Sequence, residues 1–84
     1  MLDTFVSIGD TLKEIRETKG FHLQEVAKKT AINYTILSRI ETGKRLPTKP
    51  QVQNLATFYN YSEGELIKHL IRDQAKSLWS RLIF

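Results

Sequence analysis

The sequence predicts an all-α domain built from five helices. Apolar residues recur three and four positions apart through most of the 84-residue chain, which is the spacing of one buried helix face. No segment shows the apolar and polar alternation that a half-buried strand requires. Capping residues and glycines divide the chain into five stretches of suitable length.

The first two helices follow from their end signals. Ser7 with Asp10 resembles a capped helix start, and Gly20 is suited to end the first helix. The buried face of this helix is expected to contain Ile8, Leu12 and Ile15. The second helix is short and carries Lys28 and Lys29 near its C-terminal end, where cations complement the helix dipole. Its inward residues are expected to be Val26 and Ala27.

The third helix is expected between an N-cap at Asn33 and a stop at Gly43. At about 100° per residue its side chains separate into two halves. The apolar half contains Ile36, Leu37 and Ile40, and the other half contains Thr35, Ser38, Arg39 and Thr42. Surface helices are usually richer in Glu and Lys, so this short, hydrogen-bonding half predicts a face that another molecule covers.

Two further helices complete the chain. Thr48 can cap the fourth helix, and Pro50 is tolerated in its first turn. Its buried stripe is expected to contain Val52, Leu55, Ala56 and Tyr59. Ser62 and Glu65 have the spacing of a capping box for a fifth helix that could run nearly to the C-terminus.

The apolar residues of the fifth helix do not form one continuous stripe. Leu66 and Leu70 fall on one side of the helix, and the later apolar residues fall on another. We expect the first half to pack on the core and the second half to be exposed as a dimer or partner contact. The contact residues are expected to be Leu78, Trp79, Leu82, Ile83 and Phe84. Two alternatives are that the tail folds back onto the fourth helix, or that the chain is the N-terminal part of a longer protein.

The net charge of +4 is concentrated in one window. From Lys28 to Lys49 there are six basic residues and one acidic residue, while the remainder has seven basic and eight acidic residues. A localised positive excess of this kind is typical of a surface that faces a polyphosphate.

Composition excludes several classes of protein. The chain has no cysteine, and its two histidines, His22 and His69, lack a carboxylate at metal-ligand spacing. No nucleophile and base pair, carboxylate dyad or phosphate-binding glycine loop is visible, so we expect no enzyme, no metal and no cofactor. The N-terminus lacks the features of a signal peptide, and no segment has the roughly 20 apolar residues of a membrane span. We therefore expect a cytoplasmic protein with no membrane partner.

The chain resembles the Xre family of Cro and lambda-repressor-like helix-turn-helix domains. Three segments carry the resemblance: LKEIRETKGF, QEVAKKTAINYTILSRIETGKRLP and LATFYNYSEGEL. The match runs from Ile8 to Leu70. It implies a five-helix lambda-repressor-like DNA-binding domain over residues 1–70, followed by an extended C-terminal helix over residues 71–84 that could dimerise.

The resemblance also implies roles for individual residues. The positions that enter the major groove are matched by Asn33, Tyr34, Thr35, Ser38 and Arg39. The phosphate-gripping loop is matched by Thr42, Lys44 and Arg45, and Gln24 could supply a further phosphate contact. An ion pair that ties the first helix to the third is matched by Arg16 and Glu41. By its chemistry, Arg39 is the best candidate for bidentate contact with guanine.

Three positions depart from the family pattern. Ala31 stands where glycine is usual in the turn, and alanine at positive φ costs roughly 1 kcal/mol. His22 replaces the preferred Ser or Thr cap of the second helix, and Leu23 replaces a common glutamine. These departures leave the fold in place.

The function that follows is a sequence-specific DNA-binding transcription regulator. We expect it to be a repressor and to act as a homodimer on a palindromic operator in double-stranded DNA. The alternative is a protein-interaction module, similar to an antitoxin or to the N-terminal module of a larger protein, which binds a heterologous partner through the C-terminal apolar segment.

Overall fold

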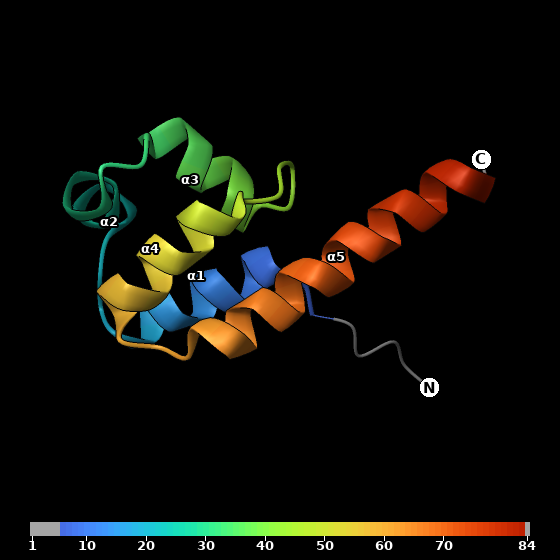
Figure 1. The fold of residues 1–84 in the computed structure, drawn as a ribbon. Coiled ribbons are helices and arrows are strands. Elements are labelled where there is room, and N and C mark those ends of the chain that lie inside the picture. The colour runs from blue at the N-terminus through green and yellow to red at the C-terminus, as the bar shows by residue number, and fades with distance from the viewer. Residues whose placement is uncertain (1–5, 84) are drawn as a thin grey trace.

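The computed structural model describes residues 6–83 of the chain, and within them it contains five α-helices and no strand. The predicted all-α, five-helix class is therefore confirmed (Figure 1). The helices are α1 (Ile8–Thr18), α2 (Leu23–Thr30), α3 (Tyr34–Glu41), α4 (Lys49–Tyr59) and α5 (Glu63–Ile83).

The helices begin where the capping residues predicted. The side-chain oxygens of Ser7, Thr48 and Ser62 each accept a hydrogen bond from the backbone N–H three residues later, at 3.1 to 3.2 Å. At the start of α2 the carboxylate of Glu25 accepts a hydrogen bond from the backbone N–H of His22 at 2.8 Å. The loss of a Ser or Thr cap at His22 is thus offset by the acid in the first turn of the helix.

One apolar core joins all five helices. α4 lies between α2 and α5, and α1 packs against α3 and α5. At the end of the core nearest to the α4–α5 loop, the rings of Phe21 and Phe58 stack at a tilt, with centroids 5.0 Å apart. The buried apolar residues are Ile8, Leu12, Ile15, Val26, Ile32, Leu37, Ile40, Val52, Leu55, Ala56, Tyr59, Leu66 and Leu70.

The close approach of α1 to α3 depends on Gly9. A Cβ atom at this position would lie only 2.1 Å from the carbonyl oxygen of Ile40, which is rigid backbone. Any side chain at residue 9 would therefore force the two helices apart. The orientation of α3 on the body of the protein thus requires glycine on the inward face of α1.

A buried carboxylate connects α5 to the start of α1. Asp73 is 8% exposed, and its Oδ2 accepts a hydrogen bond of 2.9 Å from the backbone N–H of Ile8, the first residue of α1. This N–H has no partner within its own helix, and a carboxylate is favoured at the positive end of the helix dipole. Asp73 therefore caps α1 from a helix 65 residues away in the sequence.

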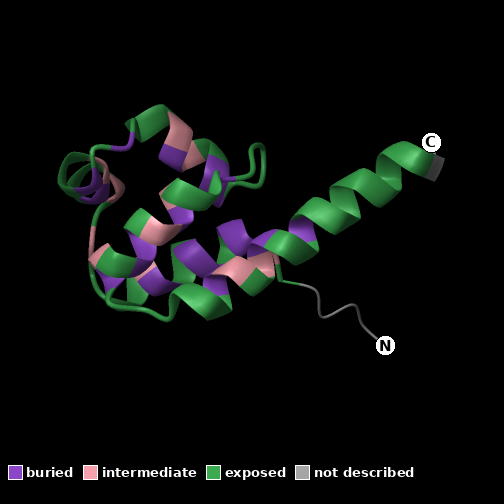
Figure 2. Cartoon of the chain, in the orientation of Figure 1, coloured by how far each residue is buried: buried purple, intermediate pink, exposed green. Residues whose placement is uncertain are grey.

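The two halves of α5 have different surroundings. Leu66 and Leu70 are buried in the core, whereas Leu78, Trp79 and Leu82 are between 55% and 72% exposed. Figures 1 and 2 show the second half of α5 extending away from the other helices, exposed along its length. The predicted change of surface along the helix is confirmed, and the alternative that the tail folds back onto α4 is wrong. No helix in the described part of the chain is long and apolar enough to span a bilayer.

Candidate nucleic-acid interface

Figure 2 shows α3 at the edge of the molecule with exposed residues on its outer side. The exposed residues of this helix are polar or aromatic. Its apolar half is directed into the protein, with Leu37 and Ile40 buried and Ile36 half-buried. On the opposite half, Ser38 is half-buried and the remaining predicted contact residues are exposed. These exposed residues are Tyr34, Thr35, Arg39 and the following Thr42. The division of this helix into a buried half and a polar half agrees with the sequence prediction.

The N-terminal end of α3 is held by Asn33, whose side-chain oxygen accepts hydrogen bonds from the N–H groups of Thr35 and Ile36 at 2.8 and 3.3 Å. Because capping occupies this oxygen, only the amide nitrogen of Asn33 is left to donate to a base or a phosphate. Tyr34 and Gln24 line one shallow hollow between the starts of α3 and α2. The structure therefore brings these two predicted contact residues together.

The C-terminal end of α3 leads into a basic loop. Gly43 has φ of +80°, and the N–H groups of Lys44 and Arg45 both donate to the carbonyl oxygen of Arg39, at 2.9 and 3.2 Å. This left-handed ending satisfies the last carbonyls of the helix and reverses the chain. It places two exposed cations directly beside the exposed end of the polar face.

The hydroxyl of Thr42 is used inside the protein. Its Oγ1 lies 2.9 Å from the carbonyl oxygen of Ser38 and donates to it, with a second, longer contact of 3.3 Å to the carbonyl oxygen of Arg39. A hydroxyl has a single proton, so in this rotamer Thr42 can accept a hydrogen bond from a ligand but cannot donate one to a phosphate. A phosphate contact through this hydroxyl requires the side chain to rotate.

The predicted ion pair between Arg16 and Glu41 is present and bidentate. Arg16 Nε donates to Glu41 Oε2 at 2.8 Å, and Nη2 donates to Oε1 at 2.9 Å. Nη1 donates to the carbonyl oxygen of Phe21 at 2.9 Å, in the turn before α2. The hydrogen bonds that Arg16 donates to the Glu41 carboxylate raise the pKa of Arg16, although burial opposes the shift. One guanidinium therefore joins α1, α3 and the start of the helix-turn-helix.

The turn between α2 and α3 has a positive φ at the position where the family pattern usually has glycine. Ala31 has φ of 60° and ψ of 24°, in the left-handed region that favours glycine. Next to it, Thr30 is buried, and its carbonyl oxygen accepts a hydrogen bond of 2.8 Å from the side-chain amide of Asn54 on α4. We infer that this contact helps to hold the turn in its strained conformation.

Sequence reasoning missed Asn54 and Asp73. Asn54 has no local signal, because its partner lies 24 residues away and on another helix. Asp73 does have a local sequence signal. It follows Leu66 and Leu70 at heptad spacing, so a charged residue occupies a core-facing position of the helix. Such a residue needs a partner, and the structure supplies it at the start of α1.

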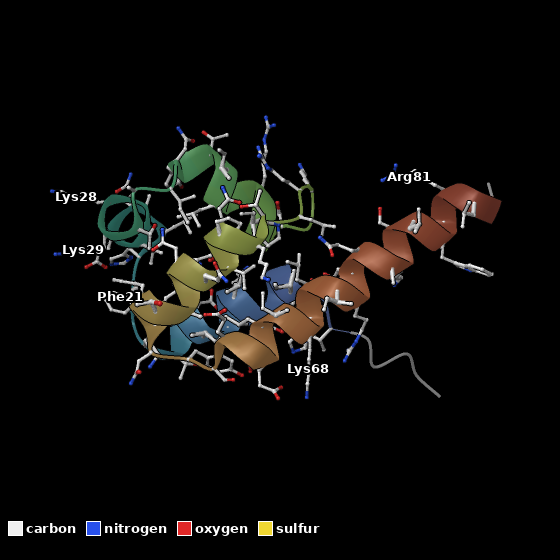
Figure 3. All side chains as sticks on the ribbon, viewed as in Figure 1. Phe21, Lys28, Lys29, Lys68 and Arg81 are labelled. Carbon is white, nitrogen blue, oxygen red and sulfur yellow. The ribbon has the colours of Figure 1, made fainter. Side chains whose placement is uncertain are left out.

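The remaining basic residues do not all share this surface. Figure 3 shows Lys28 and Lys29 projecting from α2 on the side away from α5, apart from the loop that follows α3. Both lysines lie in the last turn of α2, where they complement the helix dipole. Among the described residues, no group of three or more histidine, aspartate or glutamate side chains could hold a metal ion.

Comparison with known proteins identifies the family. Residues 7–70 match the family described as the helix-turn-helix domain. The uncharacterised HTH-type transcriptional regulator YazB of Bacillus subtilis is 36% identical over 58 residues, covering 69% of this chain and 84% of that protein. The HTH-type transcriptional regulator DdrOP3 of Deinococcus deserti is 29% identical over 59 residues, covering 70% of this chain and 46% of that protein. No solved structure matches the chain. The chain belongs to the helix-turn-helix domain family.

Proposed function

We propose that this protein is a sequence-specific DNA-binding transcription regulator of the Xre type. The observation that carries the proposal is the exposed polar half of α3, held in place by its buried apolar half and by the Arg16–Glu41 ion pair. A helix held this firmly can enter the major groove with little further loss of conformational entropy on binding. The names of the two relatives, both HTH-type transcriptional regulators, support the same function.

Two groups of residues divide the binding chemistry. The exposed loop cations Lys44 and Arg45, together with Gln24 at the start of α2, contact phosphates and set affinity and position. The bases are read by Asn33, Tyr34, Thr35, Ser38 and Arg39. Arg39 is suited to donate two hydrogen bonds to the O6 and N7 atoms of guanine.

The second half of α5 makes the protein a homodimer in this proposal. Ile71, Ala75, Leu78 and Leu82 are exposed and follow one another at intervals of four, three and four residues, the spacing of a helix-to-helix seam. Trp79, 62% exposed, lies beside this stripe. The predicted contact residue Phe84 lies outside the described residues, as does the side chain of Ile83. A two-fold pairing of α5 presents two recognition helices to a palindromic site.

Selection of DNA from a random pool tests the proposal. We expect a palindrome whose half-site spacing reports the geometry of the dimer. If each subunit neutralises four to five phosphates, the plot of log affinity against log salt concentration should have a slope of roughly −7 to −9. A slope near zero, or no enriched sequence, would refute the proposal. Expression of a reporter gene placed under the selected site should fall when the protein is present, as repression requires. A rise in expression would instead identify the protein as an activator.

Substitution of Arg39 separates base reading from phosphate binding. Arg39→Ala should weaken binding to the selected site by about 1–3 kcal/mol and relax the preference at one base pair. Binding to a duplex of unrelated sequence should change little. Arg45→Ala is the matched control, because loss of a phosphate contact should weaken both duplexes equally and reduce the salt slope by about 0.9 per subunit.

The exposed end of α5 also favours a second candidate function, the binding of a heterologous protein. Large apolar side chains that remain uncovered usually mark an interaction surface. Deletion of residues 77–84 distinguishes the two. Joint loss of dimerisation and DNA binding supports the homodimeric regulator, whereas retention of both excludes a dimer contact and favours another partner.

A further inference from the structure

The loop after α3 and the second half of α5 line a shared hollow. Figure 1 shows the α3–α4 loop projecting toward α5. From the loop, Lys44 and Arg45 line the hollow, and from α5 it is lined by Asp73, Lys76, Ser77 and Ser80. We refer to this feature as the loop–α5 hollow. It includes the two cations that the proposed function assigns to phosphates, but also a part of α5 outside the helix-turn-helix.

The lining of the loop–α5 hollow favours an anion. Among the described residues that line it, Lys44 and Arg45 are exposed cations of the loop, Lys76 is a cation of α5, and Asp73 supplies a carboxylate. That carboxylate is buried and directed to the N-terminus of α1, where its charge is partly balanced by the helix dipole. The hydroxyls of Ser77 and Ser80 supply short, neutral donors of the kind that bind phosphate oxygens.

The register of α5 explains why this face is polar. Leu66, Leu70, Asp73, Ser77 and Ser80 follow one another at intervals of four and three residues, so they lie on one face of the helix. This face is apolar where it contacts the core and becomes polar beside the loop. The exposed apolar stripe starting at Ile71 lies about 140° around the helix. A second copy bound to that stripe would leave the hollow open.

The position of Arg81, next to Ser80 in the sequence, also favours an anion near the loop–α5 hollow. Figure 3 shows the side chain of Arg81, the residue after Ser80, projecting from α5 toward the side of the molecule on which α3 lies. DNA that receives α3 in its major groove would approach from this side. The DNA backbone that flanks this major groove would then pass the α3–α4 loop first and α5 next.

We propose that the loop–α5 hollow binds a phosphate of the DNA backbone, so that α5 extends the DNA contact beyond the helix-turn-helix. This inference rests on the proposed DNA-binding function. It assigns α5 two separate faces, one apolar face for a second copy and one polar face for the DNA backbone. Each dimer would then have two symmetry-related phosphate sites at which α5 adds contacts to those of Lys44 and Arg45.

A pair of charge substitutions on α5 tests this inference. Ser80→Glu places a carboxylate in the hollow, whereas Gln74→Glu places the same charge on the same helix outside the hollow lining. Affinity for a mixed-sequence duplex is measured for full-length variants over a range of salt concentrations, with helicity and dimer content checked for each. Loss of one phosphate contact per subunit should reduce the slope by about 1.8 per dimer. This corresponds to roughly 20-fold weaker binding at about 0.2 M salt if the lines meet near 1 M. Gln74→Glu should stay within about twofold of the unsubstituted protein.

A second pair of variants adds a positive charge at each of the same two positions. A folding defect would weaken binding, so tighter binding by these variants cannot result from one. Ser80→Lys should tighten binding and steepen the slope, and Gln74→Lys should do so less. On the selected operator, a methylphosphonate at one flanking phosphate should weaken the unsubstituted protein but not Ser80→Glu. Equal effects of substitutions at residues 74 and 80, with normal binding by the unsubstituted protein, would overturn the inference and leave the proposed function intact. No binding of any duplex by the unsubstituted protein would overturn both.

Discussion

The ion pair between Arg16 and Glu41 is expected to account for a large share of the stability of this domain. In Glu41→Gln, one carboxylate oxygen becomes an NH₂ group, which cannot accept a hydrogen bond from the guanidinium. The Arg16 and Glu41 side chains are only 13% and 7% exposed, so solvent can replace little of the lost interaction. Arg16 would then be a nearly buried charge without its counterion.

The expected loss is about 3 kcal/mol, the lower end of the range for removing one partner of a buried pair, because Arg16 retains some exposure. Domains of this size are stable by about 4–13 kcal/mol, so the loss is a substantial fraction of the total. The melting temperature should fall by roughly 12–24 °C. Urea unfolding followed by far-UV circular dichroism should show a lower midpoint and an unchanged m-value.

A double-mutant cycle provides the control. Arg16→Met combined with Glu41→Leu removes both charges and should be more stable than Glu41→Leu alone, because no unpaired charge remains. If Glu41→Gln costs less than about 1 kcal/mol, or if the charge removals combine additively, the pair does not hold α1 to α3 as described.

Three further predictions concern stability. Gly9→Ala should destabilise the domain by several kcal/mol, since the new Cβ would lie 2.1 Å from the Ile40 carbonyl oxygen; urea unfolding measures this, and a change below about 1 kcal/mol would contradict the described packing of α1 on α3. Ala31→Gly should raise the melting temperature by a few degrees, because up to about 1 kcal/mol of left-handed strain is relieved; an unchanged or lower value would mean that the turn is unstrained. Burial raises the pKa of Tyr59 above its ordinary value of 10.0, so the folded state holds the phenol proton more tightly than the unfolded state. Stability from Tyr59 should therefore be fully present below about pH 10 and decline above it by at most about 1.4 kcal/mol per pH unit, and Tyr59→Phe should remove this part of the pH dependence in alkaline unfolding curves.

The sequence was sufficient for the features that depend on near neighbours. Helix starts at Ser7, Asn33 and Thr48 involve hydrogen bonds to residues two or three positions away, and helix ends at Gly20 and Gly43 involve a local change of φ. The buried and polar halves of α3 follow from helical periodicity. These interactions are short in sequence, so their signals are visible in the residue order.

The Arg16–Glu41 pair shows what a resemblance adds to this local reading. The two residues are 25 positions apart, and neither periodicity nor capping brings them together. The match to a helix-turn-helix pattern implied the contact, and the structure shows it as a bidentate pair. The individual DNA contacts stay a prediction, although the structure limits two of them. Asn33 uses its oxygen as a cap, and Thr42 donates its proton within α3.

By itself, the sequence determined the five helices, their capping residues and the two-sided character of α3, because each depends on contacts within one or two turns. Only the tertiary structure decided how close α1 and α3 approach at Gly9, how Asn54 holds the turn, and how Asp73 caps α1. It also decided that the second half of α5, which the sequence predicted to be exposed, does not fold back onto α4 and lines a hollow with the basic loop. These contacts join residues 24 or more positions apart, and they form only once the packed core has brought their helices together.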